Sequence, residues 1–460
     1  MSAPNSEIEP PLYVSVPKVY PRVVKGIFRT IKTRLGVILL TLTTIIPFIR
    51  WDRGPGMPHQ AVMFSFADMK LFFFDTIIWA QEFYFLTAIL IASALALFLA
   101  TSLFGRVWCG MACPQTVWSD LFVFLERIAE GDRNARMKLD KEPWSGRKLL
   151  IKTYKQSLWV LASAMTGLVF LGYFIDIIDA AKDMLTGEAS AAVYGFWAMF
   201  AGGTYAMAGY VKDQMCTYMC PWPRIQGGML DEQTIQVTYD TARGEKRANF
   251  KRGGSFEGRG HCVDCKMCVQ ACPMGIDIRD GVQMECINCG LCVDACNTVM
   301  KRFDLPPNLV GWRANVANPK IMRPRTLIYI ALIALVLIGA SVAGLNRSEM
   351  HLSVLGDRSP SSVRLSGGVI SNGYTVKLVN REHKSVSGKL VVTGLTGARL
   401  CLLGGPQDQS SLDLTAEPDT VTTFRVFIHQ DGKDTQQGNS PVLFSFQDGL
   451  AQAKSVFLVE

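Results

Sequence analysis

The chain has 460 residues, of which 49% are hydrophobic, and its mean hydropathy is +0.20. These values argue against a soluble globular protein, and the length predicts two to four domains. The 13 cysteines fall, with one exception, into four tight groups, which is not the pattern of a disulfide scaffold. The N-terminus is polar and proline-rich, so we expect no cleaved signal peptide.

Five apolar segments predict transmembrane helices that form an α-helical bundle. They lie at about 35–49, 83–104, 158–178, 191–211 and 326–345. The stretch between the first two, residues 51–82, contains Asp68, Lys70 and Asp75, which oppose insertion into a bilayer. We predict an interfacial helix there, with a partly re-entrant segment as the alternative.

Lysine and arginine are unevenly divided among the segments that connect these spans. Residues 1–34, 104–157 and 212–325 contain 6, 10 and 16 of them, whereas residues 50–82 and 179–190 contain 3 and 1. Because positive residues stay on the cytoplasmic side, we expect the N-terminus and the cysteine-rich segments in the cytoplasm. The C-terminal residues are then outside, in the periplasm of a Gram-negative cell. The net charge of +8 is thus explained by the orientation of the chain in the membrane, and we expect no nucleic acid as a partner.

An internal repeat of Cys-x2-Cys-x2-Cys-x3-Cys lies between the fourth and fifth predicted spans. Its two copies are 24 residues apart, and the spacing is that of bacterial ferredoxins with two [4Fe–4S] clusters. In that fold the fourth cysteine of each half binds the cluster of the other half. We therefore assign Cys262, Cys265, Cys268 and Cys296 to the first cluster, and Cys286, Cys289, Cys292 and Cys272 to the second. The alternative is a pair of structural zinc sites, whose cysteines usually come in separated pairs.

Two further cysteine pairs have the spacing Cys-x3-Cys and are each followed by proline. Cys109 and Cys113 follow the second predicted span, and Cys216 and Cys220 follow the fourth. Residues i and i+4 share one face of a helix, and the two halves look like a duplication of two spans and one pair. If the halves pack about a pseudo-twofold axis, the four thiols meet at the membrane edge.

Such a group of thiols has several chemical uses. It would bind Cu(I), zinc or an iron–sulfur centre, or form redox disulfides. The alternative is that cysteine recurs there as a small buried residue. We predict a second redox or metal station that exchanges electrons with the nearer cluster.

The residues after the fifth span predict a β-sandwich of immunoglobulin-like type. Segments of strand length, separated by Gly, Asn, Asp and Pro, lie at 374–379, 389–393, 423–428, 442–446 and 455–459. Cys401 stands alone in this region, and we expect it to pack in the core.

Four sequences match a family of known proteins. They are Trp108-Cys-Gly-Met-Ala-Cys-Pro-Gln-Thr, Glu130-Gly-Asp-Arg133, Met215-Cys-Thr-Tyr-Met-Cys-Pro-Trp-Pro-Arg224 and Gly275-Ile-Asp-Ile-Arg-Asp280. With the order of spans and the terminal sandwich, nearly the whole chain resembles the CcoG/RdxA/FixG family of cytochrome c oxidase accessory proteins. The paired Cys-x3-Cys-Pro sequences are shared more widely, with quinol-dehydrogenase-type polyferredoxins, but the sandwich separates this chain from them. Asn297 departs from generic ferredoxins, in which proline often follows the last cysteine.

The resemblance implies a multi-pass protein of the bacterial inner membrane that supports assembly of cbb-type cytochrome c oxidase by reducing Cu(II) to Cu(I). It implies that Cys109, Cys113, Cys216 and Cys220 are the catalytic, copper-binding site. Expected partners are the membrane, copper chaperones or oxidase assembly factors, and a soluble reductant or quinol as electron donor; a homodimer is left open. The rival functions are a quinol dehydrogenase that serves a periplasmic acceptor, a non-enzymatic redox-sensing scaffold and a copper chaperone.

The predicted organisation has five parts. They are a basic N-terminus at 1–34, a four-span membrane domain at 35–225, a ferredoxin domain at 226–324, a fifth span at 325–345 and the sandwich at 346–460.

Overall fold

The computed structural model describes residues 18–54, 57–249, 256–346, 348, 350–365, 367–382, 384–431 and 438–459. The chain divides into two compact units, Met1–Ala340 and Ser341–Glu460. The division falls inside the last helix, α13 (Pro324–Leu345). It therefore lies close to the predicted start of the sandwich.

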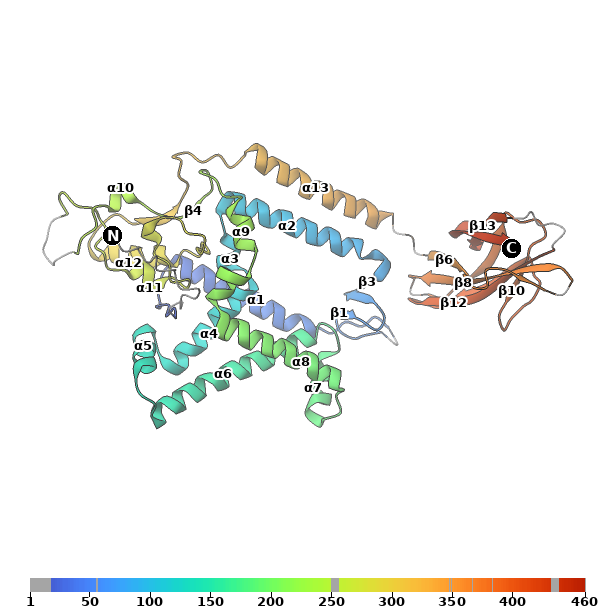
Figure 1. Ribbon diagram of the computed structural model, residues 1–460, viewed down its shortest axis with the longest axis horizontal. Coiled ribbons are helices and arrows are strands. Elements are labelled where there is room, and N and C mark those ends of the chain that lie inside the picture. Colours follow the sequence, from blue (N-terminus) through green and yellow to red (C-terminus); the bar gives the residue numbers. More distant parts are fainter. Residues whose placement is uncertain are drawn as a thin grey trace, which may run out of the picture. The chain divides into compact units, whose positions relative to one another are not determined.

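The first unit consists mainly of helices (Figure 1). Three of the described helices are long and apolar enough to cross a membrane, namely α1 (Ile27–Ile45), which a 3-10 turn extends to Phe48, α2 (Tyr84–Phe104) and α13. They coincide with the first, second and fifth predicted spans, although α1 begins at Ile27 rather than near residue 35. The chain is accordingly associated with a membrane.

The third and fourth predicted spans correspond to α6 (Gly146–Leu171) and α8 (Ala191–Thr204), which are not among the three described helices that are long and apolar enough to cross a membrane. α6 starts and ends earlier than predicted, and α8 continues as wide π turns from Tyr205 to Val211. A Cβ atom on Gly167 of α6 would lie 2.9 Å from the Ala201 nitrogen of α8, so glycine lets these two backbones approach closely. The total of five spans stays a prediction.

The interfacial helix predicted after the first span is wrong. Residues 62–79 form an antiparallel sheet of β1 (Val62–Ser65), β2 (Lys70–Phe73) and β3 (Thr76–Trp79). Valine, isoleucine, threonine and aromatic residues fit a pleated surface, and alternate side chains such as Met63 and Ser65 are buried. Ser65 and Asp68 hydrogen-bond to each other at 2.8 Å in the first turn. Of the three charged residues on which the helix prediction relied, Asp68 and Asp75 lie in the two turns and Lys70 begins β2.

The first unit also contains shorter helices and one pair of strands, several of which carry or contact the cysteines. They are α3 (Val107–Met111), α4 (Pro114–Glu130), α5 (Arg133–Lys141), α7 (Ile177–Thr186), α9 (Trp222–Gly227), α10 (Thr241–Gly244), α11 (Met267–Ala271), α12 (Leu291–Arg302), and the paired strands β4 (Gln236–Tyr239) and β5 (Val310–Arg313).

A buried ionic network joins α4, α5 and α6. Arg136, which is 1% exposed, pairs with Glu126 and Glu130. Lys152 of α6 forms one ion pair with Glu130, at 2.8 Å, and another with Asp140. Each buried charge therefore has a partner, as burial requires. The Glu130-Gly-Asp-Arg133 sequence places its glycine at the end of α4 with φ 84°, a conformation that favours glycine.

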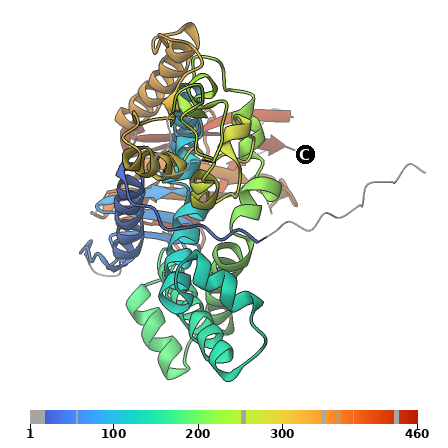
Figure 2. The same cartoon turned by 90° about the vertical axis from the view of Figure 1, so that its left-hand side faces the viewer.

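The ferredoxin segment is fastened to the start of α1. The Asp294 carboxylate of α12 accepts hydrogen bonds from the backbone nitrogens of Phe28 at 3.3 Å and Arg29 at 2.7 Å. These are among the first N–H groups of α1, which have no partner within the helix. Figure 2 shows the yellow helices of this segment beside the blue start of α1.

The same segment covers the end of α2. The last carbonyl groups of a helix lack partners within it. Here the Phe104 oxygen accepts from the Asn288 side chain at 2.8 Å, and the Leu103 oxygen accepts from the Ile235 nitrogen at 2.9 Å. The Ser102 oxygen accepts from Arg323 at 2.6 Å. The ferredoxin segment is thus an integral part of the first unit, because it packs against the ends of α1 and α2.

The second unit is a sandwich of two antiparallel sheets. One has the order β10-β12-β8-β6, with β7 on β8, and the other has the order β11-β9-β13-β14. Its strands are β6 (Met350–Gly356), β7 (Val363–Arg364), β8 (Val369–Asn380), β9 (Val386–Thr393), β10 (Arg399–Leu402), β11 (Ser411–Ala416), β12 (Val421–Asp431), β13 (Gly438–Phe446) and β14 (Ala451–Val459). All five predicted strands are confirmed, and β6, β7, β10 and β11 are additional.

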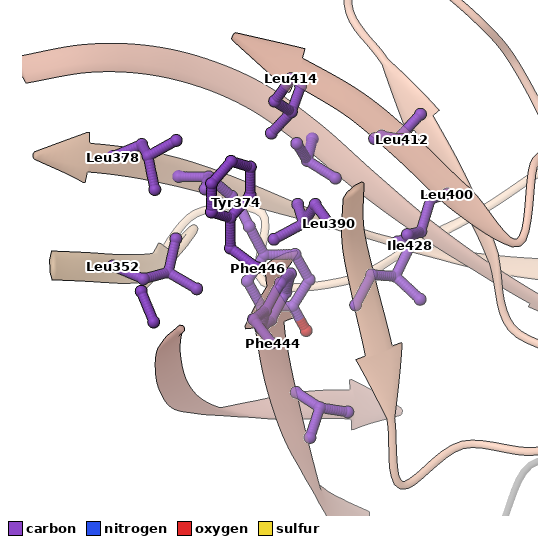
Figure 3. Packing of buried hydrophobic residues seen from close by; sticks show 14 of the residues in the cluster. Leu352, Tyr374, Leu378, Leu390, Leu400, Leu412, Leu414, Ile428, Phe444 and Phe446 are labelled. Carbon is purple, nitrogen blue, oxygen red and sulfur yellow. The ribbon is translucent and has the colours of Figure 1, made fainter. Parts of the chain in front are cut away.

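Side chains from both sheets form the sandwich core. Tyr374, Leu390, Phe444 and Phe446 point toward one another between the sheets (Figure 3) and are at most 1% exposed. The Tyr374 hydroxyl donates to the Val456 carbonyl at 2.9 Å, so the buried ring has a partner for its polar end. The sandwich therefore has a core of its own.

Candidate functional site

The eight ferredoxin cysteines line two small cavities in the first unit. Cys262, Cys265, Cys268 and Cys296 line one, and Cys272, Cys286, Cys289 and Cys292 line the other, which Cys268 also borders. Each cavity has a volume of about 20 Å³. The two cavities contain the same sets of four that the spacing assigns, and the assignment of ligands stays a prediction.

The chemistry of these cavities fits an iron–sulfur group. Burial raises the pKa of Cys268 and Cys272 to about 12, and that of Cys286 and Cys296 to about 11. Buried thiols that face one another lose their protons only beside compensating positive charge, which iron supplies. Apolar side chains such as Ile278 and Val293 surround the sites. A set of four thiols in mostly apolar surroundings is the environment that holds a [4Fe–4S] cluster; of the eight cysteines, Cys265 is exposed.

The two Cys-x3-Cys-Pro sequences are local breaks between helices. Cys109 lies on α3, and Cys113 is the residue before α4, whose first residue is Pro114. Cys216 lies on a π turn, Met215–Met219, and Cys220 ends it just before Pro221. Proline fits the first position of a helix because it needs no N–H partner there. The spacing alone had indicated that each pair lies on one face of a helix. In the structure, neither pair lies on one continuous α-helix.

The four thiols of these sequences come together. Burial raises the pKa of Cys109 to about 12, and the nearby thiols of Cys113, Cys216 and Cys220 raise it further. Burial likewise raises the pKa of Cys216 to about 11, with Cys113 and Cys220 acting in the same direction. Segments that are 107 residues apart in the sequence thus place their thiols near one another, and a common site for the four thiols stays a prediction. We call Cys109, Cys113, Cys216 and Cys220 the four-thiol site.

Gln226 of α9 contacts this site, although no sequence motif marks it. Its side chain is fully buried. Its oxygen lies 3.2 Å from the Cys109 sulfur, and its nitrogen donates to the Thr101 hydroxyl of α2 at 3.1 Å. Gln226 therefore orients the Cys109 thiol and holds α9 against α2. A single glutamine six residues after Cys220 has no recognisable spacing, so only the fold identifies it.

The four-thiol site touches the loop of the second predicted cluster. A Cβ atom on Gly110 would lie 2.5 Å from the Ile287 oxygen and 2.8 Å from Cys289 Cα. Only glycine permits this approach, so α3 rests directly on the backbone between Cys286 and Cys289. Cys109 also packs against the apolar group that contains Cys289 and Leu291.

Arg106 ties the same elements together. It is 4% exposed, and its guanidinium donates to the carbonyl oxygens of Met284, Cys286 and Pro223. Burial lowers the pKa of Arg106, and Cys109 and Cys286 oppose that shift. The cation therefore lies between the two thiol groups and favours negative charge on both.

A cavity of about 70 Å³ borders Cys216 on the side of α1 and α4. It is lined by six basic and two acidic residues, which are Arg22, Arg29, Lys32, Arg127, Arg136, Lys212, Asp120 and Asp213. Burial and the neighbouring Arg29 lower the pKa of Arg127. Four of the six cations pair with carboxylates, Arg29 and Lys32 with Asp120, and Arg136 and Lys212 with Glu126. The cations still outnumber the carboxylates around the cavity, which favours an anionic ligand. Pro273 and Ile287, which lie near the cysteines of the second predicted cluster, also line this cavity.

Comparison with known proteins identifies the family. The nitrogen fixation protein FixG of Rhizobium meliloti is 38% identical over 92% of this chain and 88% of its own length. Protein RdxB of Cereibacter sphaeroides is 41% identical over 93% of this chain and 92% of its own length. Protein RdxA of the same organism is 39% identical over 95% of this chain and 93% of its own length. The chain belongs to the FixG/RdxA family.

Family models match three parts of this FixG/RdxA-family chain. A 4Fe-4S dicluster domain matches residues 211–315, a 4Fe-4S binding domain matches residues 86–129, and an Ig-like fold at the C-terminus of FixG matches residues 340–460. The crystal structure of a FixG-related protein from Vibrio parahaemolyticus aligns over 25% of this chain and 99% of its own, with 20% identity and a TM-score of 0.21. The chain is thus an iron–sulfur electron-transfer protein with a C-terminal Ig-like domain.

Proposed function

We propose that this protein reduces Cu(II) to Cu(I) at the four-thiol site and thereby supports assembly of a haem–copper oxidase of the cbb type. One observation carries the proposal, namely the contact of Gly110 with the Ile287–Cys289 backbone. This contact sets a group of soft ligands beside the loop of a predicted cluster. Soft thiolates favour Cu(I) over Cu(II), so the site favours the product of the reduction.

The chain's own residues have defined parts in this proposal. When bound, the two [4Fe–4S] clusters supply electrons one at a time. The four thiols bind copper and stabilise Cu(I), and each Cu(II) ion takes up one electron. Gln226 orients Cys109, and Arg106 stabilises thiolate charge. The basic cavity at Cys216 favours an anionic copper complex or an anionic donor over hydrated Cu(II).

The same proposal includes the topology and the partners. Five spans place the ferredoxin segment and the four-thiol site in the cytoplasm and the Ig-like domain in the periplasm of a Gram-negative cell. Copper chaperones or oxidase assembly factors are the recipients. A soluble reductant or a quinol supplies the electrons.

A stopped-flow experiment tests the reductase. The protein is purified without oxygen, its clusters are reduced with dithionite, the excess is removed, and Cu(II) is added with a Cu(I) chelator. We expect cluster reoxidation and Cu(I) formation to proceed together, one Cu(I) per electron lost. In the Cys109→Ser/Cys216→Ser variant, reduction should slow by at least tenfold while the iron content stays unchanged.

Thr393→Ser is the control, because Thr393 lies in the other unit and outside every cysteine group. It should reduce Cu(II) at the rate of the parent. Undiminished reduction by Cys109→Ser/Cys216→Ser, with full iron content, would place the activity elsewhere and end the proposal.

Quinol oxidation is a second candidate function, favoured by an apolar cavity of about 270 Å³. It borders Pro114 beside Cys113 and is lined by Trp118, Phe170, Phe200 and Met207, among others. Ligand sites for apolar molecules have this character. The test is quinol oxidation by the purified protein. If Phe170→Trp abolishes this oxidation but leaves dithionite-driven copper reduction unchanged, the cavity binds a quinol donor.

A further inference from the structure

The Ig-like domain contains a second constellation of chemically active side chains, at Cys401, Asp408 and His429. Cys401 is buried, as predicted, but it does not belong to the apolar cluster between the two sheets. Its neighbours Leu400 and Ile428 point into the core (Figure 3). Successive residues of a strand face opposite sides of a sheet, so Cys401 and His429 share the outer face. Cys401 is nevertheless only 2% exposed.

Strand pairing brings the first two groups together. Cys401 of β10 is opposite Phe427 of β12, and His429 is two residues further along β12. Residues in this diagonal relation are on the same face and within reach of each other. The Cys401 sulfur lies 3.2 Å from His429 Nδ1.

A loop after β10 brings the third group. The Leu400 nitrogen donates to the Gln409 oxygen at 2.7 Å, and Gln409 returns the bond at 3.0 Å. This pairing folds the loop back over Cys401. Asp408 Oδ1 then lies 3.3 Å from His429 Nδ1 and 3.5 Å from the Cys401 sulfur. The Asp408 nitrogen also donates to that sulfur at 3.3 Å.

Two kinds of interaction suit this arrangement. With the thiol and Nδ1 protonated, the carboxylate oxygen accepts hydrogen bonds from both groups. With both deprotonated, the three atoms present lone pairs to one point, as metal ligands do. The convergence of three ligand atoms within 4.8 Å of one another is therefore the observation that points to a cation.

The distances agree with a tetrahedral ion. Zinc bonds of about 2.3 Å to sulfur and about 2.0–2.2 Å to nitrogen and oxygen, at tetrahedral angles, separate the ligand atoms by about 3.3–3.6 Å. The three separations here are 3.2, 3.3 and 3.5 Å. The Asp408 side chain is 53% exposed and that of His429 is 20% exposed. The fourth position is thus open to water or to a ligand from a partner.

We propose that Cys401, Asp408 and His429 bind one transition-metal ion of borderline or soft character, zinc or copper, in the Ig-like domain. One thiolate, one imidazole and one carboxylate suit either metal. The site lies in a different unit from the clusters, and it stands whether or not the four-thiol site reduces copper. The backbone N–H of Asp408 supports the thiolate charge.

Metal retention by the full-length protein tests this site. Parent and variants with intact clusters are incubated anaerobically with Zn²⁺, or in a parallel arm with Cu(I), and desalted, and metals are counted by mass spectrometry. We expect Cys401→Ser, Asp408→Asn and His429→Ala each to retain one equivalent less than the parent, with unchanged iron. Loss in the zinc arm alone assigns zinc, loss in the copper arm alone assigns copper, and loss in both assigns a site for either metal.

His351→Ala is the matched control, since His351 is an exposed histidine of the same sandwich. It should retain the parent's metal. Full retention by any one of the three ligand variants in both arms would overturn the three-ligand site.

A spectroscopic measurement does not depend on the folding of the ligand variants. In the Cys109→Ser/Cys216→Ser background, zinc-edge X-ray absorption of the loaded protein should show one sulfur at about 2.3 Å with nitrogen and oxygen neighbours. A zinc spectrum without sulfur, or with several sulfurs, would also overturn the site.

Discussion

At the scale of single residues, the contacts around the thiols matter more than the thiols' spacing. Gln226 joins Cys109 to Thr101, and Arg106 joins both cysteine groups. Neither residue belongs to a recognisable motif. Residues that orient metal ligands without touching the metal typically change affinity or activity by 10- to 100-fold when replaced.

Replacement of Gln226 should therefore impair copper reduction. Gln226→Leu removes the acceptor of the Cys109 thiol while keeping a side chain of similar size, and we expect the rate to fall about tenfold. Iron content and cluster absorption should stay unchanged. Gln233→Leu, which loses only a hydrogen bond to the Lys320 nitrogen, is the control and should keep the parent rate. Equal rates in both variants would contradict the role of Gln226.

Asp140 predicts a pH-dependent stability. Its pKa lies well below the usual range because hydrogen bonds from Lys152, Lys18 and Tyr20 outweigh the effect of burial. A lowered folded-state pKa stabilises the protein above the unfolded value near 4, and this contribution is lost as the pH falls through the folded value. Asp140→Asn should therefore lower the thermal midpoint in detergent at pH 7, and the difference should shrink below about pH 4. A difference that is independent of pH would contradict the ion pairing.

At the scale of elements, the ends of the membrane helices are satisfied by the ferredoxin segment. Asp294 accepts from the start of α1, and Asn288, Ile235 and Arg323 donate to the end of α2. Helix ends leave about four unpaired groups each. These contacts hold the predicted clusters beside the four-thiol site.

Removal of the Asp294 carboxylate should loosen the start of α1. Caps of this kind contribute about 0.5–2 kcal/mol, so Asp294→Ala should increase hydrogen exchange at the amides of Phe28 and Arg29 by about tenfold. Asp304→Ala, on the loop after α12, is the control and should leave those amides as they are. Unchanged exchange in Asp294→Ala would show that α1 does not depend on this carboxylate.

At the scale of the whole molecule, the chain consists of two units with separate cores. The core of the Ig-like domain draws on residues from Met350 to Phe457, and the apolar groups around the ferredoxin cysteines lie in the first unit. Each core is formed by residues of its own unit. The cluster cysteines and the proposed sandwich metal site thus belong to different units.

Truncation after Leu345 should accordingly leave the redox part intact. The shortened protein should keep the parent's iron per chain and its rate of Cu(II) reduction, and it should lose the one equivalent of metal that we assign to Cys401. Loss of iron on truncation would mean that the sandwich helps to hold the clusters.

Regular spacing made much of this protein predictable from sequence. The ferredoxin repeat, the paired Cys-x3-Cys-Pro sequences and five strands are local patterns, and local patterns of ligands or apolar residues carry their meaning without the fold. The error at residues 62–79 arose because aromatic residues with scattered charges suit an interfacial helix and a small sheet alike. Two hydrogen-bonded turns decided for the sheet.

The sequence by itself determined the cysteine groups, the apolar spans at both ends of the membrane unit and the sandwich, because each depends on residues that are close in the chain. Only the tertiary structure decided which groups meet. Three such contacts join distant or irregularly spaced residues. They are the packing of Gly110 on the Ile287–Cys289 backbone, the hydrogen bond between Gln226 and Cys109, and the convergence of Cys401, Asp408 and His429. Such contacts depend on packing and strand register, which no single stretch of sequence specifies.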